Sequence, residues 1–251
     1  KPNKINVYDS KKHKKKYSNE ILNDISVSYK IAVKSNSDLI TMPINKSEVK
    51  KKINFNGVTE FLGKLSRTKT YMIMKGNLFS VIPLTTHIPL KKVSKNFNNQ
   101  LNDLEILMGY LNKNNIQYKN IIFLGINPHA GEGGTIGNEE KLIISTIKRL
   151  QRKFKNYNFS GPVSADSAFR KIETKCLYIS AYHDQGLIPF KTLSFGKGVN
   201  FTSGLKHVRT SPDHGTAYEI AGRGVAKDTS FLEAIKLAVE VYKNRIKAST
   251  S

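Results

Sequence analysis

Short apolar runs bounded by polar segments recur along this chain. Residues 81–86, 121–126 and 176–181 each form such a run. Each run is too short to be a helix that is buried on all sides. Continuous apolar runs of this length are typical of strands that are covered on both faces of a sheet. We therefore predict three buried strands, which would form the centre of the fold.

The segments around and between the predicted strands have apolar residues at helical spacing. This spacing predicts helices over residues 19–33, 59–65, 101–112, 139–153 and 230–246, with Asn138 as the cap of the fourth. Residues 38–41 are expected to form a short strand, and Ser47 to cap a further short helix. Strands that alternate with helices predict an α/β fold, in which a mostly parallel sheet carries helices on both faces.

The composition fits a globular protein. With 251 residues, 39% of them hydrophobic, the chain can bury a large core, as one α/β unit or as two small lobes. No apolar run approaches the roughly 20 residues that span a bilayer, and the opening residues are polar, unlike a signal peptide. The single cysteine, Cys176, lies within a predicted strand. We therefore expect a cytoplasmic protein with a buried, reduced thiol.

The formal charge of +22 raises the alternative of nucleic-acid binding. Lysines are scattered along the whole chain, however, and only residues 11–16 form a compact basic block. Scattered charge favours a solvated surface over a specific nucleic-acid site. We therefore expect no specific nucleic-acid partner and no membrane partner. The chain begins with Lys1, so it is expected to be a fragment.

A histidine follows each of the three apolar runs. His87, His129 and His183 stand shortly after residues 81–86, 121–126 and 176–181. Ligands of open α/β sheets bind outside the carboxyl ends of the strands, so these imidazoles can converge there. Three neutral imidazoles suit a divalent metal, although a histidine in a loop is often only hydrogen-bonded structure. Both interpretations stay open on position alone.

Two glycine-rich stretches are candidate anion sites. Residues 129–137 precede a predicted helix, where free N–H groups favour an anion, but Ile136 breaks the dinucleotide-binding pattern and a tight turn is the alternative. Residues 196–204 lie between Lys191 and Arg209, and these cations suit a phosphate, the alternative being a basic surface loop. Asp213 is interpreted as a helix cap rather than a cofactor contact.

Several motifs resemble the 4-hydroxythreonine-4-phosphate dehydrogenase family. They are NPHAGEGG at residues 127–134, YHDQG at 182–186 and RTSPDHGTA at 209–217, together with residues 86–90 and 161–166. The resemblance runs in order from about residue 38 to the last helix. It implies one dehydrogenase unit over residues 1–251 without the family's N-terminal segment. The implied fold has two α/β lobes around an active-site cleft, as in isocitrate and isopropylmalate dehydrogenases, with the lobe boundary left open.

The resemblance implies an activity in vitamin B6 biosynthesis. Members oxidise 4-phosphohydroxy-L-threonine with NAD or NADP to 2-amino-3-oxo-4-phosphooxybutanoate. That product decarboxylates to 3-amino-2-oxopropyl phosphate on the route to pyridoxal 5'-phosphate. The family also uses a divalent metal, which is zinc, cobalt or magnesium.

The resemblance also assigns residues, and it implies a homodimer in which His183 completes the partner's site. The implied metal ligands are His87, His129 and His183. The implied contacts to the phosphorylated substrate are Thr59, Lys191, Asn200 and Arg209. Asp166 and Asp184 are carried over as candidate catalytic residues in supporting roles, as is Asp213, while residues that bind the nicotinamide cofactor are not identified.

Val58 departs from the family pattern, because the family has a substrate-contacting histidine at this position. A related dehydrogenase of erythronate or threonate 4-phosphate is therefore an alternative to the 4-phosphohydroxythreonine enzyme. Two further hypotheses are a basic nucleic-acid-binding protein and a catalytically inactive homologue that lacks the N-terminal segment.

Overall fold

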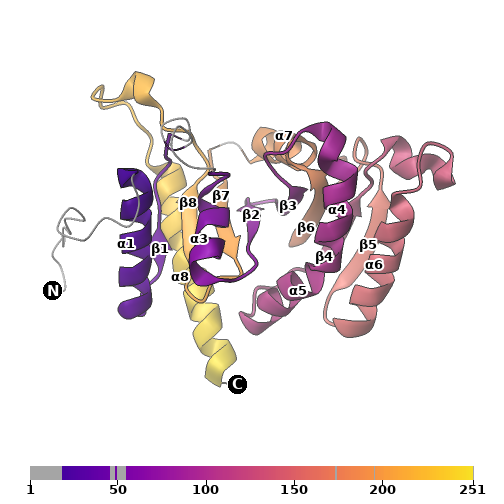
Figure 1. Ribbon diagram of the computed structural model, residues 1–251, viewed down its shortest axis with the longest axis horizontal. Coiled ribbons are helices and arrows are strands. Elements are labelled where there is room, and N and C mark those ends of the chain that lie inside the picture. The colour runs from indigo at the N-terminus through magenta and orange to yellow at the C-terminus, as the bar shows by residue number, and fades with distance from the viewer. Residues whose placement is uncertain (1–18, 46–48, 50–54, 173, 195, 251) are drawn as a thin grey trace.

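The computed structural model describes residues 19–45, 49, 55–172, 174–194 and 196–250. Its centre is an eight-stranded sheet with the order β1-β8-β7-β2-β3-β6-β4-β5 (Figure 1). The strands are β1 (Leu39–Ile40), β2 (Tyr71–Lys75), β3 (Phe79–Thr85), β4 (Asn120–Leu124), β5 (Asn158–Val163), β6 (Cys176–Tyr182), β7 (Val199–Ser203) and β8 (Arg209–Pro212).

The three predicted apolar strands are confirmed as β3, β6 and β4, which lie next to one another and run parallel. Four of the seven strand pairings are parallel, since β1 also pairs parallel with β8 and β4 with β5. The antiparallel pairings all involve β2 or β7. The prediction of a mostly parallel sheet is therefore confirmed, and the antiparallel strands were not foreseen.

Helices cover both faces of the sheet, as predicted. The helices are α1 (Glu20–Lys34), α3 (Val58–Ser66), α4 (Val93–Asn102), α5 (Leu104–Lys113), α6 (Glu140–Lys153), α7 (His183–Leu193) and α8 (Thr229–Thr250). Short 3-10 segments, η2 (Leu90–Lys92), η3 (Pro128–Gly134) and η4 (Tyr218–Ile220), connect them. None of the helices in the described ranges is long and apolar enough to cross a membrane.

Two local predictions about helices are wrong, and a third falls on a residue outside the described ranges. The helix predicted over residues 101–112 is interrupted at Asp103, which separates α4 from α5. Asn138 does not cap α6, because Glu139 occupies the cap position and makes no side-chain capping bond. Ser47 lies outside the described residues.

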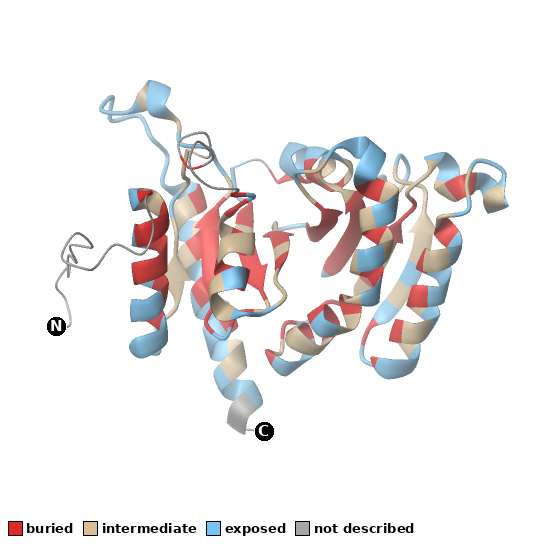
Figure 2. Cartoon of the chain, viewed as in Figure 1, coloured by how far each residue is buried: buried red, intermediate tan, exposed pale blue. Residues whose placement is uncertain are grey.

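Two apolar clusters lie against opposite faces of the sheet. The larger joins β2, β3, β4 and β6 to α4, α5, α6 and α8, and includes Ile82, Phe97 and Leu150. The smaller packs α7 against the other face through Phe190 and contains Cys176, which is buried as predicted. Buried residues are concentrated in the strands and on the inner sides of these helices (Figure 2). Burial of this apolar surface is the main force that holds the layers together.

The strands β7 and β8 bury polar side chains more densely than the central parallel strands, where Ser80, Thr85 and Ser180 are buried. Thr202, Ser203, Thr210 and Arg209 are all nearly inaccessible to solvent. Buried polar groups must be hydrogen-bonded, and here Arg209 donates to Thr202 across the pairing of β8 with β7, while the hydroxyl groups of Thr210 and Ser203 donate to the carbonyls of Ala234 and Tyr71. This polar part of the sheet forms the floor of the candidate site.

Candidate functional site

A pocket of about 320 Å³ opens where β7 and β8 meet α3 and α7. It is lined by all four residues that the sequence assigned to the phosphorylated substrate, and by His87 and Asp213. The residues in question are Thr59, Lys191, Asn200 and Arg209. The chain brings them together from positions up to 150 residues apart in sequence, as the difference between 59 and 209 shows.

Arg209 is a buried cation at the floor of this pocket, with only 3% of its surface exposed. Its guanidinium donates hydrogen bonds to the hydroxyl of Thr41 (Nε, 3.0 Å) and to the hydroxyl of Thr202 (Nη1, 3.1 Å). Burial lowers the pKa of Arg209 to about 10, which still leaves it charged at neutral pH, and Glu60 raises it slightly. Within the described residues no carboxylate forms an ion pair with this side chain. A buried, unneutralised cation favours an anionic ligand.

Thr59 and Val58 begin α3 on another side of the pocket. The Thr59 side chain is buried, and its hydroxyl lies 3.1 Å from the hydroxyl of Thr202, which also accepts from Arg209. Val58 lines the pocket and also packs against the apolar cluster that includes Leu62. A side chain at position 58 therefore faces both the pocket and an apolar core.

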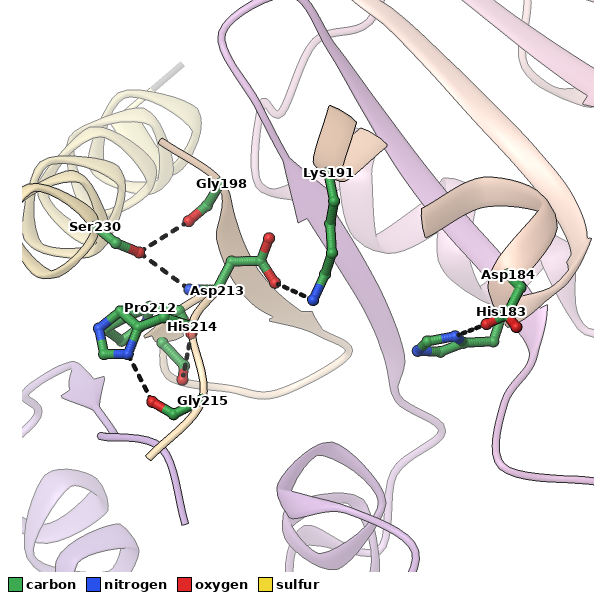
Figure 3. Close-up of polar contacts among 10 residues, drawn as sticks. His183, Asp184, Lys191, Gly198, Pro212, Asp213, His214, Gly215 and Ser230 are labelled. Carbon is green, nitrogen blue, oxygen red and sulfur yellow. Dashed lines mark hydrogen bonds and ion pairs between the residues drawn. The ribbon is translucent and has the colours of Figure 1, made fainter. Parts of the chain in front are cut away.

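Lys191 and Asp213 meet at the mouth of the pocket. The Lys191 ammonium extends from α7 to within 3.7 Å of Asp213 Oδ1 (Figure 3). Burial raises the pKa of Asp213, while Lys191 acts in the opposite direction. The backbone N–H of Asp213 donates to the hydroxyl of Ser230 at 3.0 Å. Asp213 follows β8 directly, so its predicted role as a helix cap is wrong, because no helix begins there.

His87 and His183 lie close together at the ends of the parallel strands β3 and β6. The centroids of their rings are 5.9 Å apart. His183 begins α7, and its Nδ1 lies 2.7 Å from Oδ1 of Asp184. Figure 3 shows the His183 ring projecting toward the side on which Lys191 and Asp213 lie. These two imidazoles are thus the part of the predicted metal site that one chain assembles.

His129 follows β4 and does not join them. Across the described part of the chain, no group of three or more histidine, cysteine, aspartate or glutamate side chains is arranged to hold a metal ion. Asp166, which is exposed, lies near enough to His129 for their charges to interact. A hydrogen bond from the Ser164 hydroxyl lowers the pKa of Asp166, and the nearby charge of His129 contributes a smaller lowering. Each candidate catalytic aspartate therefore accompanies one histidine, Asp184 with His183 and Asp166 with His129.

The backbone that carries His129 is left-handed. From His129 to Gly134 every residue has a positive φ, including the non-glycine residues His129, Ala130 and Glu132. Such a conformation costs an L-residue about 1–2 kcal/mol, so the surrounding contacts must hold it. The structure shows that the loop forms a tight turn of unusual hand, and anion binding by it stays a prediction.

Gln185 links the two histidine-bearing segments. Its amide nitrogen donates to the carbonyl of Gly125, just before the His129 turn, at 2.7 Å. Its amide oxygen accepts from the backbone N–H of Ala181 in β6 at the same distance. Sequence reasoning placed Gln185 in a motif without a role, and it passed over Thr41 and Thr202, because short polar side chains outside a recognised motif carry no distinctive signal.

Comparison with known proteins identifies the family of this chain. The family described as "Pyridoxal phosphate biosynthetic protein PdxA" matches residues 4–238. The 4-hydroxythreonine-4-phosphate dehydrogenase of Aquifex aeolicus is 44% identical over 210 residues, which cover 79% of this chain and 63% of that protein. The chain belongs to the PdxA family. The enzyme of the same name from Sulfurihydrogenibium is 38% identical over 213 residues, which cover 82% of this chain and 66% of the relative.

A solved structure agrees with the PdxA assignment. The crystal structure of 4-hydroxythreonine-4-phosphate dehydrogenase from Klebsiella pneumoniae superposes with a TM-score of 0.69 at 29% identity, covering 88% of this chain and 69% of that one. The resemblance found in the motifs is therefore confirmed. The chain spans less than two thirds of the length of the two PdxA relatives named above.

Proposed function

We propose that this chain carries the active site of a 4-hydroxythreonine-4-phosphate dehydrogenase. The proposed reaction oxidises 4-phosphohydroxy-L-threonine with NAD or NADP to 2-amino-3-oxo-4-phosphooxybutanoate, which loses carbon dioxide to give 3-amino-2-oxopropyl phosphate for pyridoxal 5'-phosphate biosynthesis. The observation that carries the proposal is the buried guanidinium of Arg209 in a pocket that His87 also lines. The names of the relatives support the same reaction.

The polar end of the pocket suits the phosphate group of that substrate. Arg209 is held in place by Thr41 and Thr202, so its remaining donor capacity can face a phosphate without losing side-chain freedom on binding. The Lys191 side chain is exposed and lies 3.7 Å from Asp213, so it can leave Asp213 for a more highly charged partner. Asn200 and Thr59 supply hydrogen bonds that orient the ligand. Binding energy from the phosphate would thus fix the reacting carbon at a defined place.

The histidines are proposed to hold a divalent metal, namely zinc, cobalt or magnesium. Imidazole nitrogens suit zinc and cobalt, and the close approach of the His87 and His183 rings fits a shared ion. A bound metal would lower the pKa of the substrate hydroxyl, while a nicotinamide cofactor accepts the hydride. Asp184, 2.7 Å from His183 Nδ1, would fix the orientation of that ring and leave its other nitrogen free.

We further propose that the chain forms one dehydrogenase unit with two α/β lobes and acts as a homodimer in the cytoplasm. In the shared-site form of this proposal, His183 completes the site of the partner subunit. The alternative is a site built within one chain, with which the 5.9 Å between the His87 and His183 rings is also compatible. Mixed dimers separate the two forms, as described in the Discussion.

A second candidate substrate class rests on Val58. An apolar side chain lines the pocket at this position, and it cannot donate a hydrogen bond to a substrate group. This favours a four-carbon acid phosphate without a group that would need a hydrogen bond from residue 58, such as erythronate or threonate 4-phosphate. The rest of the pocket would serve either substrate.

One assay tests both candidates. Formation of reduced nicotinamide is followed with 4-phosphohydroxythreonine, erythronate 4-phosphate and threonate 4-phosphate, each with NAD and with NADP, before and after treatment with a chelator. We expect turnover of at least one substrate, lost on chelation and restored by zinc, cobalt or magnesium. Absence of turnover with all three substrates, in protein reloaded with metal, would contradict the proposed function.

A further inference from the structure

A single buried carboxylate holds the turn that carries His129. Glu140 projects from the first turn of α6, and only 6% of its surface is exposed. Its Oε1 accepts the backbone N–H groups of Ile126 at 3.1 Å and Asn127 at 2.8 Å. Its Oε2 accepts the side-chain amide of Asn127 at 3.0 Å. All three donors stand immediately before the His129 turn, which is defined here as residues 128–135.

The His129 turn has little support of its own. Its left-handed run holds a few internal backbone bonds, such as that from Ala130 N to Asn127 O at 3.2 Å and from Ile136 N to Gly131 O at 3.2 Å. A strained conformation of this kind persists only when its surroundings determine it. Glu140 supplies a rigid anchor, because it is fixed on a packed helix and accepts three hydrogen bonds from the residues that lead into the turn.

Glu140 approaches the turn so closely that a side chain at Gly131 would displace its carboxylate. At Gly131 (φ +78°) an added Cβ would stand 2.7 Å from Glu140 Oε2. Glycine is therefore favoured there both by the left-handed backbone and by the close contact with the carboxylate. The turn and Glu140 fit together as one unit.

We propose that Glu140 is a positioning residue that fixes the left-handed His129 turn and thereby aims the His129 imidazole. That the aimed imidazole binds a metal rests on the proposed function. That Glu140 anchors the turn does not depend on the proposed function. In sequence Glu140 stands only as an acidic residue near the start of a helix, and nothing in its position along the chain reveals the bonds that it makes.

The chemistry requires a carboxylate rather than an amide. In Glu140→Gln one oxygen can still accept from the backbone of Ile126 and Asn127, but the new NH₂ group then faces the NH₂ group of Asn127, donor against donor. In Glu140→Ala the backbone N–H groups of Ile126 and Asn127 lose their acceptor, while the side-chain amide of Asn127 keeps its hydrogen bond to Glu139 Oε2 at 2.8 Å. The two variants should therefore show graded effects on the turn.

Hydrogen exchange measured by mass spectrometry tests the turn directly. Peptides spanning residues 126–137 should exchange about tenfold faster in Glu140→Gln and about a hundredfold faster in Glu140→Ala, while peptides from β3 and β6 keep their wild-type rates. Glu105→Gln is the matched control, because Glu105 binds Arg149 and Lys153 of the same helix α6 without touching the turn. Wild-type exchange over residues 126–137 in Glu140→Gln and in folded Glu140→Ala would overturn the inference.

Titration with Co²⁺ then tests the consequence for His129. If Glu140 aims this imidazole, Co²⁺ should bind about tenfold or more weakly to Glu140→Gln than to wild type or to Glu105→Gln, and His129→Ala should weaken it further. Faster exchange in the turn together with wild-type Co²⁺ binding by His129→Ala would leave the anchoring role standing and refute the proposed metal role of His129. Faster exchange with wild-type Co²⁺ affinity in Glu140→Gln, where His129→Ala loses Co²⁺, would overturn the claim that Glu140 aims His129.

Discussion

The two ends of the candidate site are built in different ways. At the anion end, Arg209 lies inside the sheet on β8, is almost fully buried, and is fixed by hydroxyl groups from two other segments. At the histidine end, His87 and His129 are exposed on strand-end loops with left-handed backbone, and His183 is only partly covered. One end is complete within the fold, and the other is presented by its surface.

This difference suggests that the anion end orients the substrate and that the histidine end carries out the chemistry. A buried guanidinium with fixed partners is preorganised, so the fold itself determines where the phosphate binds. Exposed imidazoles on loops depend on a further component, such as a metal ion or a partner subunit, to fix their geometry. We therefore expect changes at the two ends to fail in distinguishable ways.

The largest effect is expected at the histidine end. His87→Ala, His129→Ala and His183→Ala should each lower kcat/KM by about a thousandfold or more, since metal assistance contributes several kcal/mol. Unfolding temperatures should stay near that of the wild type, because the exposed or partly exposed side chains contribute little to the core. Metal analysis of the purified variants is the check. Full metal occupancy with a wild-type rate in any one of them would show that its histidine is not a ligand.

The next largest effect is expected at the anion end. Arg209→Lys removes the fork that reaches Thr41 and Thr202 together, and breaking a buried charged interaction of this kind costs about 2–5 kcal/mol. We expect kcat/KM for the phosphorylated substrate to fall about a hundredfold while metal content stays at the wild-type level. Arg152→Lys, on the exposed side of α6, is the control and should behave like wild type. Loss of metal in Arg209→Lys would show that the two ends are not independent.

The elements that sequence could predict are those with an apolar signature. The parallel strands β3 and β6 are apolar runs buried on both faces, and β4 is an apolar run that is partly exposed on one face, so their composition alone indicates strands. Strands β7 and β8 instead bury threonine, serine and arginine, and their sequence resembles a polar loop after glycine-rich residues. Their partners lie far away in sequence, so no local pattern shows that these polar groups are satisfied.

The residues of the candidate site likewise fall into those that sequence patterns indicate and those that they do not. Histidines that follow apolar strands could be recognised from position, and the resemblance supplied the pocket residues. Asp213 has the local appearance of a helix cap in the sequence, whereas in the structure it faces Lys191 from another element. Glu140 and Gln185 act through backbone groups of distant loops, and hydrogen bonds of that kind leave no trace in spacing.

Val58→His tests which substrate the pocket between the two ends accepts. If the substrate is 4-phosphohydroxythreonine, a new hydrogen bond to it is worth about 1–3 kcal/mol, so kcat/KM should rise about tenfold or more. If the pocket is fitted to an analogue, the imidazole should slow turnover of that analogue and leave the hydroxythreonine ester poor. Kinetics of both proteins on both substrates decide between these outcomes. Unchanged kinetics throughout would mean that residue 58 does not contact the substrate, although it lines the pocket.

The smallest effect concerns the ion pair at the pocket mouth. Burial raises the pKa of Asp213, so the folded state holds its proton to a higher pH than the unfolded state does. Stability from this group is therefore present below the unfolded pKa of about 3.9 and is lost as pH rises through the folded value. Asp213→Asn should be more stable than wild type at neutral pH by about 1 kcal/mol or less, with the difference vanishing in acid. Thermal unfolding at both pH values measures it, and a variant less stable at neutral pH would show that the pair with Lys191 stabilises the fold.

Mixed dimers test the central claim, that the anion end is complete in one chain while the histidine end is completed by a partner. Inactive His87→Ala and His183→Ala chains are unfolded together, refolded and assayed. In a shared-site dimer, a mixed pair holds one site with all its histidines intact, so random pairing should restore about a quarter of wild-type activity. If both histidines act within one chain, as their 5.9 Å separation also permits, every site keeps one substitution. The mixture would then stay inactive while a wild-type chain carried through the same procedure recovered, and that result would contradict the account.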